Sequence, residues 1–139
     1  MSGSLGDNAL TLLGSATVNL AAAAGTEVVL YTNPTDKQMV PVLVIADDFD
    51  EEVDESVVTL GKSGGDCDEF SGAAGFTLTN ITAGFVDEAL ILQPVPAATP
   101  QVGMVLHEGE SFAVEIDTQE TTGAATCTMQ LWGREKVAA

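Results

Sequence analysis

Short apolar runs recur along the chain, separated by turn-forming Gly, Pro, Asn and Asp, whereas the spacing of an amphipathic helix is scarce. The clearest run is residues 111–117, where Phe112, Val114 and Ile116 alternate with small or acidic residues. Such alternation is typical of a strand with one face in the core and the other in water. The pattern predicts eight or nine strands, at residues 16–21, 27–32, 39–46, 56–60, 76–81, 89–93, 103–107, 111–117 and 125–132.

These elements predict an all-β fold, an antiparallel β-sandwich of two sheets. With 139 residues, 45% of them hydrophobic, the chain is long enough for one domain with its own core. We expect a flexible N-terminal arm over residues 1–13 and a single β-sandwich domain over residues 14–139. The larger side chains of the core are expected to be Phe49, Phe70, Phe76, Phe85, Phe112 and Trp132.

Turn residues predict two hairpins. In residues 26–44, the sequence Asn33-Pro34-Thr35-Asp36 supplies turn chemistry, because Pro34 fixes φ and Asn and Asp side chains bond to nearby backbone. Pro41 then indicates an edge position or a bulge, since it cannot donate to a neighbouring strand. The second hairpin spans residues 103–117 and turns at Gly109, which can adopt a positive φ.

Two segments fit no strand. Phe49, Val53 and Val57 recur every four residues around the acidic segment 47–55 and could form one short amphipathic helix, although crowded like charges disfavour it. Residues 61–75 are rich in glycine and predict a long loop of the kind that often carries binding contacts.

Charge excludes some functions. The chain has 21 acidic residues against four Lys and Arg, a net charge of −17. Such a surface repels nucleic acid and anionic membranes, and four basic residues are too few to neutralise a phosphate backbone. No apolar run approaches the roughly 20 residues of a membrane span. We therefore expect a soluble protein with no nucleic-acid or membrane partner.

The acidic segment 47–55 holds seven carboxylates in nine positions, and Asp48, Asp50, Glu52 and Asp54 alternate as ligands of a calcium loop do. The EF-hand pattern fails, because Val53 occupies the glycine position and Thr59 the position of the final Glu. A looser calcium site from this segment, or from Asp66, Asp68 and Glu69, is one hypothesis. A second hypothesis is that the carboxylates face a basic partner surface. The default interpretation is a solvated acidic loop on a surface adapted to a salty medium.

Catalytic signatures are weak. His107 is the one histidine, which is too few for a zinc site, and the Asp residues beside Cys67 disfavour a thiolate. Cys67 and Cys127 are expected to be free thiols. With 21 carboxylates, some pair will match glycosidase spacing by chance. Tyr31 and Trp132 are the aromatic residues available for a sugar platform, and core packing explains both. We therefore expect no enzyme activity and no cofactor.

The chain resembles small jelly-roll structural proteins of tailed bacteriophages, in particular head decoration or cement proteins. Three stretches carry the resemblance: TEVVLYTNPTDKQMVPVLV, LILQPVPAATPQVGMVLHEGESFAVEI and GAATCTMQLWG. The resemblance implies a jelly-roll sandwich of about eight strands, a place on the outer surface of the virion capsid, binding to the major capsid protein, and a homo-oligomer, often a trimer. A carbohydrate-binding or receptor-facing module of a tail or fibre is the alternative function.

On this basis we expect capsid or subunit contacts from apolar residues of the arm and of one loop. These are Leu5, Leu10, Leu12, Leu13, Ala73, Ala74 and Phe76.

Overall fold

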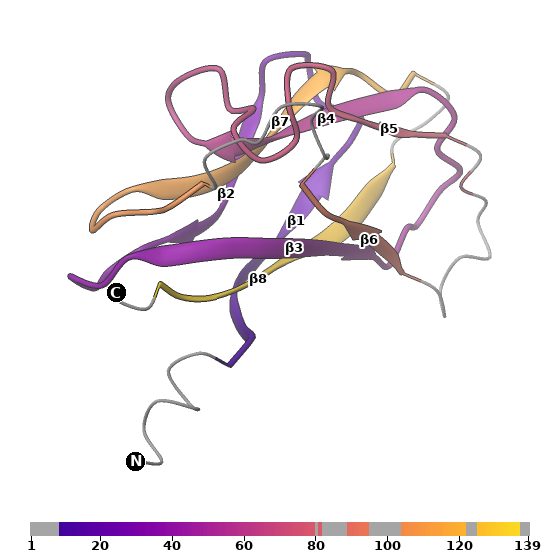
Figure 1. Ribbon diagram of the computed structural model, residues 1–139. Coiled ribbons are helices and arrows are strands. Elements are labelled where there is room, and N and C mark those ends of the chain that lie inside the picture. Colours follow the sequence, from indigo (N-terminus) through magenta and orange to yellow (C-terminus); the bar gives the residue numbers. More distant parts are fainter. Residues whose placement is uncertain (1–8, 80, 82–88, 95–103, 122–124, 137–139) are drawn as a thin grey trace.

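The computed structural model describes residues 9–79, 81, 89–94, 104–121 and 125–136. Within them, eight strands form two four-stranded antiparallel sheets that lie face to face (Figure 1). Sheet A has the order β1-β8-β3-β6, and sheet B has the order β2-β7-β4-β5. The all-β sandwich is therefore confirmed. The strands are β1 (Thr11–Asn19), β2 (Glu27–Thr32), β3 (Met39–Asp47), β4 (Ser56–Lys62), β5 (Phe76–Leu78), β6 (Leu90–Leu92), β7 (Ser111–Thr118) and β8 (Thr126–Glu135).

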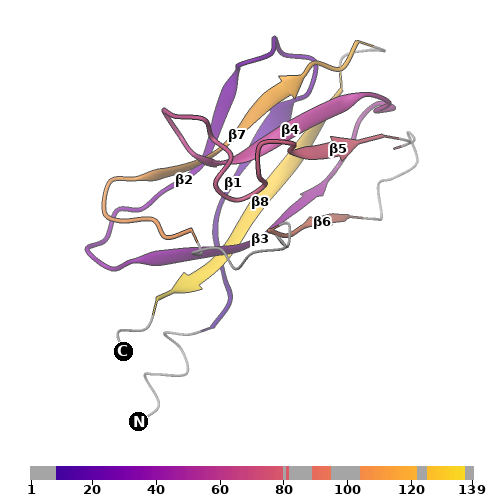
Figure 2. The ribbon, with the colours of Figure 1, turned by 45° about the horizontal axis from the view of Figure 1, so that its top comes forward.

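The pairing of the strands is that of a jelly roll. β1 pairs with β8, β2 with β7, β3 with β6 and β4 with β5, so that the chain forms one long hairpin. Rolling up this hairpin brings β3 beside β8 and β4 beside β7, which completes the two sheets. Figure 2 shows β8 crossing the molecule, with its end beside the start of β3. Eight antiparallel strands joined in this way define the jelly-roll architecture.

The core lies between the sheets and is built from alternate strand residues. On β8, Cys127, Met129 and Leu131 are buried, and the residues between them face outward. Phe112 of β7 is fully buried and meets Phe70 edge to face, with ring centroids 5.3 Å apart. Burial of such side chains contributes roughly 2 kcal/mol each, which is the main stabilisation of the sandwich.

Both predicted hairpins are wrong. In residues 26–44, β2 belongs to sheet B and β3 to sheet A, so the two strands do not pair as a hairpin. In residues 104–117, β7 belongs to sheet B, whereas residues 104–107 form only a single bridge, from Leu106 to Met39 at the start of β3. The turn chemistry itself is present. Asn33 is buried and its Nδ2 donates to the carbonyls of Lys37 and Leu106, and Gly109 has a φ of 84°. These turns reverse the chain, but the chain then crosses to the opposite layer.

The other local predictions have mixed outcomes. The register of β3 shifts between Pro41 and Leu43, which confirms the bulge. The possible helix around residues 47–55 is wrong, because Phe49 and Val53 are buried anchors of an irregular connection from sheet A to sheet B. Thr11 already pairs with Gly133 in β1, so the expected arm 1–13 overlaps the first strand by three residues. Residues 1–8 lie outside the described residues.

The predicted core aromatic residues are largely confirmed. Phe49, Phe70 and Phe112 are buried, and Phe76 packs against the core. Phe85 lies outside the described residues. Trp132 is a correction: it alternates with the inward-facing residues of β8 and so lies on the outer side of sheet A. Both cysteines are buried free thiols, as predicted.

Candidate functional site

The outer side of sheet A is uncharged over most of its area. Side chains of paired residues point to the same side of a sheet, so the register defines rows that cross the strands. We call this surface face A, and its residues are Leu12, Ser15, Thr17, Leu43, Ile45, Ile91, Thr128, Gln130 and Trp132. Asp47 and Arg134 lie at its two ends, and no other charged side chain of the described strand residues points to this side. In a chain of net charge −17, such a surface needs an explanation.

Face A also exposes large apolar side chains. Leu12 is 43% exposed and Ile91 62%, and Leu10, just before β1, is 47% exposed. Trp132 lies between Leu12 and Leu43 in one row, and its Nε1 donates to Oε1 of Gln130 at 3.2 Å. Four strands spaced about 4.8 Å apart give a footprint of roughly 25 Å by 15–20 Å. Ser15, Thr17, Thr128 and Gln130 lie among the apolar side chains of this face. Large apolar side chains exposed on an uncharged, partly polar surface are typical of an interaction site.

The outer side of sheet B is acidic. Glu27 of β2 stands directly opposite Glu115 of β7. Desolvation raises the pKa of Glu115, and the negative charges of Glu27, Asp117, Asp66 and Asp68 raise it further. Like charges facing each other across strands destabilise a sheet. The two faces of the sandwich therefore differ sharply in charge, and face A is the one that a partner can approach without carboxylates.

Hydrogen bonds from backbone N–H groups to carboxylates hold the acidic segment 47–55 to the β7–β8 connection and to the start of β8. The fully buried carboxylate of Glu120 accepts from the backbone N–H groups of Asp54 and Glu55. The carboxylate of Glu55 in turn accepts from the N–H and hydroxyl of Thr121. Asp50 Oδ1 accepts from the N–H of Thr126 at 2.7 Å, and this bond lowers the pKa of Asp50. Three carboxylates thus have structural partners.

Asp48, Glu52 and Asp54 are exposed, while Asp66 and Asp68 lie in the β4–β5 loop on the sheet B side. The described residues bring together no group of three or more His, Cys, Asp or Glu that could hold a metal ion. The calcium hypothesis stays a prediction, which thermal melting with and without calcium tests.

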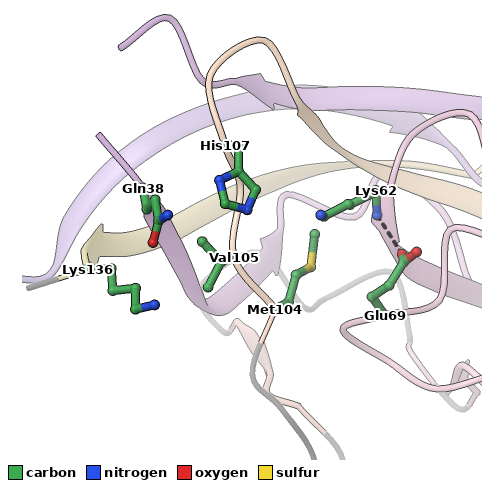
Figure 3. A pocket seen from close by; sticks show the side chains of 7 residues that line it. All are labelled: Gln38, Lys62, Glu69, Met104, Val105, His107 and Lys136. Atoms are coloured by element: carbon green, nitrogen blue, oxygen red, sulfur yellow. Dashed lines mark hydrogen bonds between the residues drawn. The ribbon is translucent and has the colours of Figure 1, made fainter. Parts of the chain in front are cut away.

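A groove of about 400 Å³ lies at the end of the sandwich away from the acidic segment (Figure 3). Lys62 at the end of β4 and Lys136 after β8 reach into it from opposite sides, with His107 and Gln38 beside them. Met104 and Val105 form an apolar part of the groove wall. Glu69 also lines the groove, but its Oε1 already accepts from the backbone N–H of Lys62 at 2.8 Å.

The predicted contact residues do not form one surface. Leu10 and Leu12 are exposed on the sheet A side, whereas Leu13 packs against the core. Ala73 and Ala74 are exposed in the loop before β5 of sheet B, where Phe76 packs against the core. Leu5 lies outside the described residues.

Of the residues of face A, only Leu12 was predicted from the sequence as a contact, and four other apolar residues were missed: Leu43, Ile45, Ile91 and Trp132. A signal for them is present. The run VPVLVIA in β3 and LIL in β6 are apolar at every position, whereas β7 alternates with acidic residues. A strand that is apolar in both phases has two faces to cover, and the sandwich core covers only one of them.

The described thiols are poor nucleophiles. Burial, with smaller contributions from nearby carboxylates, raises the pKa of Cys67 and of Cys127 to about 12. Neither thiol forms a significant thiolate fraction at neutral pH. Among the described residues, no helix is long and apolar enough to cross a membrane.

The fold defines the chain as an eight-stranded jelly-roll sandwich, and two solved chains with this fold come from phage capsids. A chain of "Cyanophage Pam1 capsid asymmetric unit" has a TM-score of 0.56 and 10% sequence identity, over 94% of this chain and 87% of that chain. A chain of "Capsid of Ralstonia phage GP4" has a TM-score of 0.50 and 18% identity, over 94% and 86%. No protein-family model and no curated protein matches the sequence.

Proposed function

We propose that the chain is a non-enzymatic virion structural protein that decorates the outer surface of a phage head by binding the major capsid protein through face A. The observation that carries the proposal is an uncharged apolar face on a strongly acidic jelly roll. The fold similarity to chains of two phage capsids over 94% of the sequence supports a role in the virion.

The charges of the sandwich fit this orientation. With face A against the shell, Leu12, Ile91 and Trp132 leave water, and the carboxylates of sheet B stay hydrated on the outer side. A protein that binds the assembled lattice better than free capsid subunits stabilises the lattice by mass action. If the copies form an oligomer, such as a trimer, each added contact raises the avidity for the shell.

Quantitative mass spectrometry of virus particles purified from the source organism tests the proposal. A copy number near that of the major capsid protein, or a simple fraction of it, is expected for a decoration protein. A handful of copies per particle, together with measurable glycan binding, would favour the receptor-facing module of a tail or fibre. Absence from the particles would overturn the virion assignment.

Substitutions on face A test the binding surface. Leu12→Ser and Ile91→Ser should weaken binding to particles stripped of this protein by about tenfold or more, because each removes a large exposed apolar side chain from the interface. Val29→Ser is the matched control: Val29 is 45% exposed, but it lies on β2 of sheet B. Equal loss with all three variants would reject face A as the docking surface.

The N-terminal arm is a separate part of the proposal. Because Thr11 already belongs to β1, a deletion that tests the arm has to end before that strand. Deletion of residues 2–8 should weaken capsid binding without changing the urea midpoint of unfolding. Unchanged capsid binding would exclude a contribution of the arm.

A further inference from the structure

The positive charges of the chain gather at one end of the sandwich. Lys37 precedes β3, Lys62 ends β4, Arg134 and Lys136 lie at the end of β8, and His107 lies just before β7. These are all the basic side chains of the sequence. Because antiparallel neighbours such as β3 and β8 place these residues together, the clustering follows from the register.

The opposite end carries only negative charge. β3 leads from Met39 beside the groove to the acidic segment at Asp47, a distance of about 30 Å for nine residues. In that segment Asp48, Glu51, Glu52 and Asp54 are exposed. The two salt bridges among the described residues, Lys37 with Glu135 and Lys62 with Glu110, are both at the groove end.

The groove has free capacity for carboxylates. Lys136 makes no salt bridge within the described residues. Lys62 Nζ forms a salt bridge with Oε2 of Glu110 at 3.2 Å, and the side chain of Lys62 stays 33% exposed. Both amino groups point toward the space between them (Figure 3). Five carboxylates, those of Asp36, Glu69, Glu108, Glu110 and Glu135, also lie at this end, so its four Lys and Arg leave it close to neutral overall. The amino groups of Lys62 and Lys136 in the groove are therefore the local attraction for an incoming carboxylate.

From this complementarity we infer that the groove binds the acidic segment 47–55 of a second copy of the chain, in a head-to-tail contact. The contact is heterologous: the groove of one copy meets the acidic end of the next, and such contacts close into rings or extend into chains. Exposed Glu51 and Glu52 supply carboxylates for Lys62 and Lys136. The inference is independent of the proposed capsid role, because it concerns the protein alone in solution.

Self-association at fixed ionic strength tests the contact. In 0.15 M NaCl, analytical ultracentrifugation should show oligomers of the unmodified protein, and Glu51→Gln/Glu52→Gln should weaken association by at least tenfold. The direction of the change in affinity is diagnostic. Removing two carboxylates changes the net charge from −17 to −15 and reduces general repulsion, so a purely electrostatic effect of net charge would tighten association. The matched control Asp36→Asn/Glu108→Gln removes the same charge at the other end and should not weaken association. Equal or tighter association of the Glu51/Glu52 variant would overturn the inference, as would a monomeric unmodified protein.

A mixing experiment distinguishes head-to-tail contact from a symmetric one. Lys62→Gln/Lys136→Gln keeps an intact acidic end, and Glu51→Gln/Glu52→Gln keeps an intact groove. Each variant alone should be monomeric, and the mixture should form a heterodimer that grows no further. In a symmetric contact that needs both ends, the mixture would stay monomeric, and the inference would fail.

Carbodiimide coupling gives the contact directly. Mixed ¹⁴N and ¹⁵N copies should yield an amide between the Nζ of Lys62 or Lys136 of one copy and a carboxylate of segment 47–55 of the other, with the carbodiimide leaving as a urea. Cross-links confined to other carboxylates would overturn the proposed occupant of the groove.

Discussion

Gly14 lies where β1 of sheet A passes close to β2 of sheet B. A Cβ at this position would come closer than 3.0 Å to the carbonyl oxygen of Leu30, so the two sheets can meet here only without a side chain. The register of β1 also shifts between Leu12 and Gly14, which turns Leu12 outward to face A and leaves Leu13 against the core. One small residue thus contributes both to the closure of the sandwich and to the shape of the candidate site.

Gly14→Ala should lower the free energy of unfolding by about 2 kcal/mol, since the added methyl group forces backbone apart. Gly65→Ala is the control, because a Cβ there meets nothing within 4 Å, and its effect should stay within about 0.5 kcal/mol. Urea denaturation followed by tryptophan fluorescence measures both. Equal stability of the two variants would contradict the close approach of the sheets.

The buried carboxylate of Glu120 also stabilises the fold, through its bonds to the acidic segment. Glu120→Ala should destabilise the protein by roughly 2–3 kcal/mol, because the N–H groups of Asp54 and Glu55 lose their acceptor inside the protein. Glu120→Gln keeps one acceptor oxygen and should cost less than the alanine variant. The same denaturation experiment applies, with exposed Glu108→Ala expected to change stability by less than about 0.5 kcal/mol.

Strand pairs determine where charge accumulates on the sandwich. β2 and β7 put Glu27 and Glu115 side by side, and the β4–β5 loop adds Asp66 and Asp68 nearby. By contrast, the outward positions of β3, β6 and β8 are apolar or neutral between Asp47 and Arg134. The difference between the faces is therefore a property of whole elements and their register.

Glu115→Gln should stabilise the protein at pH 7, raising Tm by about 1–3 °C through relief of the cross-strand repulsion. A carboxyl with a raised pKa in the folded state destabilises the fold when it is ionised. This cost is complete above the folded pKa and disappears as the pH falls below the unfolded pKa. The gain should accordingly vanish near pH 3.5 in calorimetry, and a gain that persisted there would exclude a charge effect.

The elements could be predicted because their signals are local. Alternation marked β7, and turn residues marked the turns at Asn33 and Gly109. Which sheet each strand joins could not be predicted, since a turn reverses the chain without specifying the layer that the next strand enters. For this reason both expected hairpins were wrong although their turns were right.

The site was predicted less well for a related reason. The bonds from Glu120 to Asp54 and Glu55 join residues 66 and 65 positions apart, a separation that no local pattern reveals. Leu12 was found as an apolar residue of the N-terminal segment, but its neighbours Trp132 and Leu43 on face A come from other strands. An alternation test applied to β3 and β6 would have indicated the second apolar face.

At the scale of the whole molecule, a net charge of −17 opposes compactness by self-repulsion. The charge is distributed unevenly: sheet B and the acidic segment carry most of it, face A is nearly neutral, and all basic side chains lie at the groove end. The stability and the assembly of the protein should therefore respond to ions in different ways.

Raising NaCl from 0.05 to 0.5 M should raise Tm by several degrees, because the Debye length falls from roughly 14 Å to about 4 Å and screens the dispersed carboxylates. General screening predicts that calcium at matched ionic strength adds nothing further, whereas the looser calcium site of the sequence analysis predicts an additional rise in Tm. Differential scanning calorimetry with and without EDTA measures both effects. A calcium increment lost with EDTA would support a specific site.

The position of β8 has a consequence for biosynthesis. β8 follows the other seven described strands in the sequence, yet it lies between β1 and β3 in sheet A, and β1 pairs with no other strand among the described residues. During translation sheet A therefore waits for a central strand, and β1 stays without a paired strand until residues 126–135 have left the ribosome. A chain that stops before Thr126 cannot form this sheet, and so it cannot present face A. The topology of the fold thus makes the proposed docking surface depend on complete synthesis of β8.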